Sequence, residues 1–136
     1  MVSIGGAGVF VKELEQALIE GEIDVAVHSL KDVPSEMDSR LTLAGFLKRA
    51  NPYDVLIAKN HTLKTLPMGA KVGTGSPRRI LQLREQRPDL SFVDLRGNLA
   101  SRIAKVENKE LEAILLGAAG LERLGLLDVV SETFSP

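Results

Sequence analysis

Apolar positions near the start of the chain recur with the spacing of an amphipathic helix, and charged positions fall between them. The apolar face is formed by Phe10, Val11, Leu14, Ala17 and Leu18. Gly21 follows this pattern, and a glycine in the left-handed conformation is a common helix end. The pattern therefore predicts an amphipathic helix that ends at Gly21 and buries one face.

After this helix, short apolar runs alternate with longer amphipathic stretches. The short runs predict strands at residues 23–27, 41–47, 54–58, 70–73, 91–95, 112–116 and 129–134. The longer stretches predict helices at residues 76–86, 98–106 and 118–124. Strands that alternate with helices over short connections indicate an α/β fold with open, mainly parallel sheets and flanking helices.

The composition places the chain in the globular class and excludes several kinds of site. Its 136 residues are 44% hydrophobic and 26% charged, which is enough apolar material for one domain or two small lobes. The absence of cysteine excludes disulfides and thiolate ligands within the chain, and only two histidines argue against a metal site. The formal net charge of −1 gives no general attraction to nucleic acid or membranes, and we expect a soluble, cytoplasmic protein.

The loop after residues 70–73 carries unusual charge at the place where open α/β sheets bind ligands, beyond the carboxyl end of a strand. Its glycines permit close backbone approach, Ser76 suits a helix N-cap, and Pro77 suits the first helical position. Arg78 and Arg79 then fall in the first turn, where the helix dipole disfavours cations. The pattern favours a bound anion that compensates them, and the alternative is that both arginines point into solvent or pair with nearby acids.

A second loop with the same design follows residues 91–95. Arg96 lies at the end of the strand, Asn98 can cap the next helix, and that helix carries Arg102 near its start. Residues 76–105 contain seven cations and three anions, a local balance of +4. With few aromatic residues and no continuous basic helix face, this balance favours a small anion over a nucleic acid.

A third strand-end loop, residues 28–34, supplies a hydroxyl, an ammonium and a carboxylate through Ser29, Lys31 and Asp32. Neighbouring positive charge would keep Asp32 ionised, and such a carboxylate could stabilise a cationic intermediate or relay a proton. A surface ion pair between the same side chains is the alternative. The polar stretch at residues 48–52 is a candidate crossover between two lobes.

Five strings, in this order and spacing, resemble the hydroxymethylbilane synthases, also called porphobilinogen deaminases. They are FVKEL at residues 10–14, HSLKDVP at 28–34, GTGSPRR at 73–79, LRGN at 95–98 and AGLERLG at 119–125. The resemblance implies two lobes similar to type II periplasmic binding proteins, divided into an incomplete first lobe, a crossover and a second lobe at residues 1–47, 48–52 and 53–136. It also implies a third domain, absent from this chain, in which a cysteine carries a dipyrromethane cofactor.

Enzymes of that family are transferases that condense four porphobilinogen molecules head to tail, with loss of ammonia, to give linear hydroxymethylbilane for tetrapyrrole (haem) synthesis. The resemblance implies that Asp32 is the catalytic carboxylate, which steadies positive charge on pyrrole nitrogens. It implies that Phe10 borders the cleft and that the carboxylates of cofactor and substrate are held by Ser29, Lys31, Thr74, Ser76, Arg78, Arg79, Arg96 and Arg102. The expected partners are porphobilinogen and the growing oligopyrrole, with no nucleic acid and no membrane, and the full-length protein is expected to be a monomer.

This chain departs from the family pattern in three respects. Ala7 stands in the glycine loop where the family usually has a lysine, no cysteine is present, and the family's first strand is expected before Met1. We therefore expect the chain by itself to be catalytically inactive. The alternative interpretation is a standalone module with the same fold that binds a small organic anion.

Overall fold

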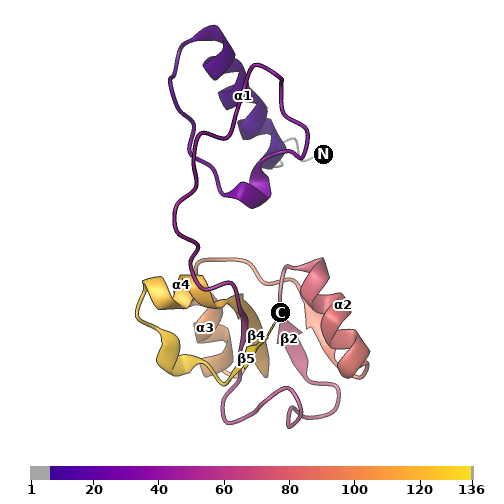
Figure 1. Cartoon of the computed structure of the whole chain (residues 1–136). Coiled ribbons are helices and arrows are strands. Elements are labelled where there is room, and N and C mark those ends of the chain that lie inside the picture. Colours follow the sequence, from indigo (N-terminus) through magenta and orange to yellow (C-terminus); the bar gives the residue numbers. More distant parts are fainter. Residues whose placement is uncertain (1–6, 136) are drawn as a thin grey trace. The chain divides into compact units, whose positions relative to one another are not determined.

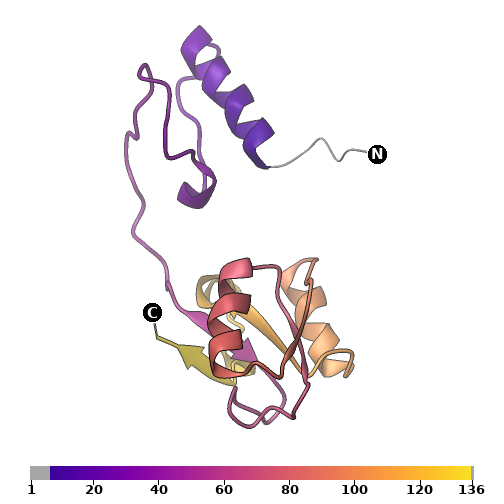
Figure 2. The same cartoon turned by 90° about the vertical axis from the view of Figure 1, so that its right-hand side faces the viewer.

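The computed structural model describes residues 7–135, and these divide into two compact units, one up to Lys48 and one from Arg49 onward (Figures 1 and 2). The described part of the first unit contains helix α1, Ala7–Glu20, and the short 3-10 helix η1, Leu30–Asp32. Within residues 7–135, no helix combines the length and the apolar character that crossing a membrane requires.

Helix α1 ends at the glycine that the sequence indicates. Gly21 has a φ of +74°, and its N–H donates to the carbonyl of Leu18. The N–H of Glu22 donates to the carbonyl of Ala17 at 2.9 Å. These bonds satisfy carbonyl groups that the end of the helix would otherwise leave without partners. Val11, on the predicted apolar face, is buried, so the prediction of an amphipathic helix is confirmed.

Two predicted strands of the first unit are wrong. Residues 23–27 and 41–47 form no strand. A strand needs a neighbour that donates and accepts backbone hydrogen bonds, and residues 7–48 contain no other strand that could pair with either segment. Apolar side chains of both segments therefore stay in solvent, with Val27 at 88% exposure and Leu47 at 95%. Strand propensity alone does not supply the partner.

The second unit is a five-stranded sheet with helices on both faces. Its strands are β1 (Asp54–Ile57), β2 (Lys71–Gly73), β3 (Ser91–Val93), β4 (Ala113–Gly117) and β5 (Glu132–Phe134). Its helices are α2 (Pro77–Gln86), α3 (Leu99–Glu107) and α4 (Ala118–Arg123), and η2 (Leu127–Val129) is a 3-10 turn. The predicted elements of this region are present, with ends shifted by a few residues, and the α/β class is confirmed.

The strands lie in the order β3-β2-β4-β1-β5. Strand β2 runs parallel to β3 and β4, whereas β1 runs antiparallel to β4 and β5, so the sheet is mixed. In the register of β1 and β4, Asp54 lies opposite Gly117. The first residue of β1 is therefore at the sheet edge where β2, β3 and β4 end, which is the edge where α/β sheets bind ligands.

Alternating side chains of the central strands divide the core between the two faces of the sheet. Val55 and Ile114 pack with residues of α3 and α4, whereas Leu56 and Leu115 pack with Leu83 of α2. Figure 1 shows α2 on one side of the sheet and α3 with α4 on the other. Full burial of such a side chain stabilises a fold by about 1.5–3 kcal/mol, so this two-sided core holds the strand ends firmly in place.

Candidate functional site

The candidate site lies at the edge where β2, β3 and β4 end. The loop after β2 follows the neighbouring strand closely, because the N–H of Thr74 donates to the carbonyl of Val93 at 3.0 Å. A Cβ added to Gly73 would lie 2.8 Å from Cδ1 of Leu111. This close approach explains why Gly73, one of the two glycines of the loop, is a residue without a side chain.

Thr74 and Ser76 shape the start of α2. Thr74 is 1% exposed, and its hydroxyl accepts a hydrogen bond from the N–H of Ser76 at 3.3 Å. Ser76 occupies the N-cap and Pro77 the first helical position, as predicted, but the Ser76 side chain makes no capping hydrogen bond. The backbone N–H groups of the first helical turn and the Ser76 hydroxyl therefore do not hydrogen-bond to each other. This arrangement suits a helix start that binds an anion.

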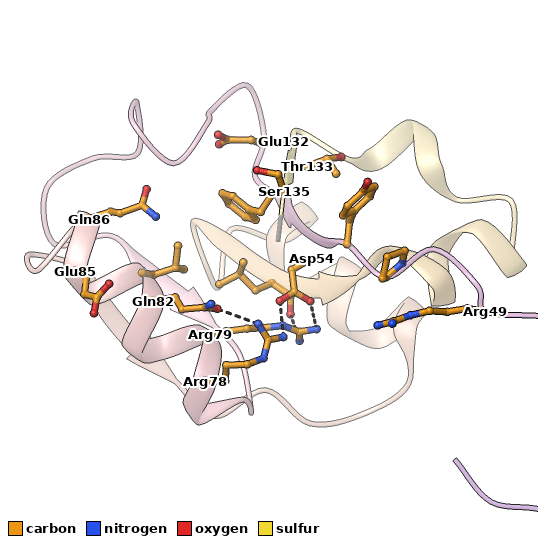
Figure 3. Close-up of a pocket in the computed structure, with 15 residues that line it drawn as sticks. Arg49, Asp54, Arg78, Arg79, Gln82, Glu85, Gln86, Glu132, Thr133 and Ser135 are labelled. Carbon is orange, nitrogen blue, oxygen red and sulfur yellow. Dashed lines mark hydrogen bonds and ion pairs between the residues drawn. The ribbon is translucent and has the colours of Figure 1, made fainter. Parts of the chain in front are cut away.

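The two arginines of this helix start meet at one acid. Nη2 of Arg78 donates to Oδ2 of Asp54 and Nη2 of Arg79 donates to Oδ1 of the same carboxylate, each at 2.7 Å (Figure 3). Nη1 of Arg78 also donates to Oε1 of Gln82 at 2.9 Å, and Nη1 of Arg79 donates to the carbonyl of Leu115 at 3.4 Å. The structure therefore contains the pairing with a nearby acid, which was the alternative to a bound anion for these arginines.

Asp54 is held in place by backbone contacts on both sides. The carbonyl of Tyr53 accepts a hydrogen bond from the N–H of Ala118 at 2.9 Å, and Asp54 itself lies opposite Gly117 in the ladder. Sequence reasoning missed Asp54 because a mainly parallel sheet would place the first residue of a strand at the opposite edge. The one available signal was the carboxylate itself, a charged residue that begins the buried run after Tyr53.

The electrostatics of this cluster favour an ionised acid and a residual positive charge. Burial raises the pKa of Asp54, but the hydrogen bonds and charges of Arg79 and Arg78 outweigh it and hold that pKa below its usual range. Two guanidinium groups and one carboxylate leave a net charge of about +1 by formal charges at neutral pH. The arginines are therefore only half compensated within the cluster.

A cavity of about 780 Å³ opens over the cluster. Its charged lining residues are Arg49, Asp54, Arg78, Arg79, Glu85 and Glu132, and all of them belong to the second unit. Nε of Arg79 is buried without a hydrogen-bond partner. A buried N–H without a partner is uncommon in folded proteins, but an atom this buried is out of reach of a ligand; the 60% exposed Arg78 side chain supplies the donors that an additional anion in the cavity can reach.

The second charged loop is close in sequence but makes different contacts. Nε of Arg96 donates to Oδ2 of Asp94 at 2.7 Å, and Nε of Arg102 donates to the carbonyl of Gly97 at 2.7 Å. The predicted cap of α3 is confirmed, because Oδ1 of Asn98 accepts from the N–H of Ser101 at 2.9 Å. Neither Arg96 nor Arg102 lines the cavity that contains Arg78 and Arg79.

The third loop belongs to the first unit. Ser29 precedes η1, Lys31 and Asp32 lie within it, and all three residues are exposed. The N–H of Asp32 donates to the carbonyl of Ser29 at 2.9 Å, which closes the short turn. Phe10 lies in α1, but its side chain falls outside the described part of the structure. The predicted meeting of Asp32 with the arginine loops stays a prediction.

A family model described as "Porphobilinogen deaminase, dipyromethane cofactor binding domain" matches residues 1–136. The chain belongs to the porphobilinogen deaminase family. This assignment agrees with the resemblance carried by the five strings in the sequence.

Curated porphobilinogen deaminases match over most of this chain. The enzyme of Xanthomonas campestris pv. campestris (strain B100) is 54% identical over 127 residues, which cover 93% of this chain and 42% of the relative. That of Geobacter sulfurreducens is 49% identical over 132 residues, which cover 97% of this chain and 42% of the relative. The chain therefore spans about two fifths of the length of these porphobilinogen deaminases.

A solved structure of a lipoprotein from Bacillus subtilis aligns with a TM-score of 0.48 and 18% identity, over 62% of this chain and 45% of that one. The α/β class of this porphobilinogen deaminase family member rests on its own sheet and helices, which do not depend on that likeness.

Proposed function

We propose that this chain supplies the catalytic acid and the carboxylate-binding edge of a hydroxymethylbilane synthase. The reaction joins four porphobilinogen molecules head to tail, releases ammonia and yields linear hydroxymethylbilane. Membership of the porphobilinogen deaminase family supports the reaction class. The observation that carries the binding role is the pair of guanidinium groups of Arg78 and Arg79, which one internal carboxylate only half compensates.

The proposed binding residues differ in role, because their side chains differ in burial and in hydrogen-bond partners. Arg78 and Arg79 hold donors at the cavity, and Ser76 has a hydroxyl that is not used for capping, so these three residues are proposed to contact acetate and propionate groups directly. Thr74 is buried with its hydroxyl turned to the Ser76 amide, so its proposed role is to shape the loop. Arg96 and Arg102 extend the positive edge beyond the cavity, as a polyanionic chain of pyrroles requires.

Asp32 is proposed to be the catalytic carboxylate, with Ser29 and Lys31 beside it as ligands of substrate carboxylates and Phe10 at the border of the cleft. Loss of ammonia from porphobilinogen leaves positive charge on the pyrrole ring, and an ionised acid next to the ring nitrogen stabilises that charge. The exposure of Lys31 and Asp32 leaves both side chains accessible to a ligand.

The donor set of this chain fits a dipyrromethane, which carries acetate and propionate groups, because guanidinium groups and hydroxyls bind carboxylates. When bound, that cofactor supplies the pyrrole to which the first substrate unit is joined. The chain contains no cysteine, so its proposed thioether link to a third-domain thiol lies outside these 136 residues. We further propose that the whole protein is cytoplasmic and monomeric, and that this chain by itself is inactive.

The test is a chimera in which this chain replaces the matching residues of the Xanthomonas campestris relative, to which it is 54% identical. We expect the chimera to consume porphobilinogen and release ammonia. Asp32→Asn should lower turnover by at least a factor of about 10² and leave binding of porphobilinogen within about threefold, because the arginines are unchanged. Turnover that survives Asp32→Asn would show that Asp32 is not the catalytic acid, whereas a chimera that binds porphobilinogen without turning it over would favour the alternative, a module that only binds small organic anions.

A further inference from the structure

Asp54 uses only part of the hydrogen-bonding capacity of the two arginines. It accepts from one nitrogen of Arg78 and from one nitrogen of Arg79, both at 2.7 Å. Each guanidinium group carries five N–H donors, and the Arg78 side chain is 60% exposed. The carboxylate therefore bridges the two arginines and leaves donors for a second anion beside it.

A second anion on this pair would lie close to the Asp54 carboxylate. The repulsion between two anions grows in proportion to the charge of each and is weakly screened away from bulk water. The Asp54 side chain is only 16% exposed, and the two arginines with Asp54 carry a net charge of about +1. A dianion meets twice the repulsion from Asp54 that a singly charged carboxylate meets, so Asp54 removes more of the attraction that the two arginines offer to a dianion.

We propose that Asp54 tunes the specificity of the arginine pair: it positions both guanidinium groups, and its fixed charge reduces the preference that the two arginines alone would have for dianions over singly charged carboxylates. The fixed negative charge lowers the affinity for dianions, such as sulfate or a phosphate ester, more than it lowers the affinity for a carboxylate. This inference rests on the proposed function, in which the ligand carries several separate carboxylate groups. It adds a reason why a site for an anion contains an acid at its centre.

The test is an NMR titration of the whole chain with two probes, propionate and sulfate, at constant ionic strength. Side-chain signals of Arg78 and Arg79 report binding at the cluster. In Asp54→Asn the affinity for sulfate should increase at least about tenfold more than the affinity for propionate, because the removed repulsion scales with ligand charge.

Two further variants separate charge from structure. Asp54→Glu keeps the negative charge and should keep the wild-type ratio of the two affinities within about threefold. Asp94→Asn removes an acid that pairs with the exposed Arg96 outside the cavity, and it should leave the ratio unchanged. If Asp54→Asn does not fold, Asp54→Ser removes the same negative charge and replaces it in the comparison.

Different failures point to different proposals. Equal changes for both probes in Asp54→Asn would overturn the role of Asp54 and leave the carboxylate site standing. If neither probe moves the Arg78 and Arg79 signals of the wild type, both this inference and the proposed carboxylate site are wrong.

Discussion

The ion cluster at the start of α2 couples ligand binding to stability through residues of unequal burial. The side chains of Asp54 and Arg79 are 16% and 20% exposed, whereas Arg78 is 60% exposed. An exposed pair contributes little, but removing one partner from a half-buried pair leaves a charge in poor surroundings. Most of the stabilisation in this cluster therefore comes from the pair between Asp54 and Arg79.

The pH dependence of stability should report this pair. The arginines hold the pKa of Asp54 below its usual range despite its burial, so its stabilising contribution is present above the ordinary pKa of about 3.8 and is lost as the pH falls through the lowered value. We expect the Tm of the wild type to exceed that of Asp54→Asn by a constant amount between pH 5 and pH 7, roughly the range above its unfolded titration.

That Tm difference should shrink as the pH falls below about 4. Thermal unfolding followed by circular dichroism from pH 2.5 to pH 7, roughly the range spanned by carboxyl titration, measures it. Asp38 and Asp89 also have lowered pKa values because of Arg40 and Arg87, but their contributions cancel in the comparison of two variants. A difference that grows toward low pH would show that Asp54 is not stabilised as a carboxylate.

Arg79 should contribute most to anion binding among the arginines of α2. Arg79→Gln removes the half-buried positive charge, so we expect the affinity for propionate to fall at least about tenfold, as loss of a charge-assisted bond implies. Arg84 provides the matched control, because its guanidinium lies 5.5 Å from the centre of the Phe92 ring and does not line the cavity. Arg84→Gln should leave the affinity within about twofold, and an equal loss in both variants would indicate only a general field effect.

At the scale of secondary-structure elements, the loop between β3 and α3 is tightly constrained at one glycine. Gly97 has a φ of +107°, and a Cβ there would lie 2.4 Å from Oγ of Ser101. That hydroxyl is itself fixed by a 2.9 Å bond to the carbonyl of Asn98. The glycine therefore allows the cap of α3 to form directly beside Arg96.

Gly97→Ala should consequently destabilise the chain more than an alanine at another glycine of positive φ. Gly69 is the control, because its φ is +74° but a Cβ there meets nothing within 4 Å. We expect Gly69→Ala to lower the free energy of unfolding by about 1 kcal/mol through backbone strain, and Gly97→Ala by about 2 kcal/mol or more through strain and the contact with Ser101. Urea denaturation measures both, and equal losses would mean that Ser101 moves aside freely.

Elements whose signals are local were the ones that the sequence predicted well. Helices α2 and α3 begin beside Ser76 and Asn98 as expected, because capping depends on residues next to the helix end. Residues 23–27 and 41–47 were predicted wrongly, because a strand depends on a partner that its own sequence does not encode. The direction of β1 is equally non-local, and it decides whether Asp54 lies at the site edge. Neighbouring residues alone therefore could not reveal the acid between the arginines.

On the scale of the whole molecule, the two units differ in how much of their apolar surface they bury. The second unit buries apolar side chains on both faces of its sheet. The described part of the first unit leaves large apolar side chains in solvent, at Val25, Val27, Phe46 and Leu47. Apolar segments of strand-like sequence whose backbone lacks a paired neighbour are templates for pairing with another chain. The chain by itself therefore has a defined route to self-association.

We expect the chain to associate at micromolar to millimolar concentrations, the usual range for exposed strand-prone segments, and charges on these segments to prevent it. The double variant Val27→Lys with Leu47→Lys should elute as a monomer in size-exclusion chromatography with light scattering, because lysine blocks strand pairing between chains. Met68→Lys is the matched control, since Met68 is 89% exposed but is an isolated apolar residue of the second unit. It should associate like the wild type, whereas relief of association by Met68→Lys alone would place the contact on the second unit instead.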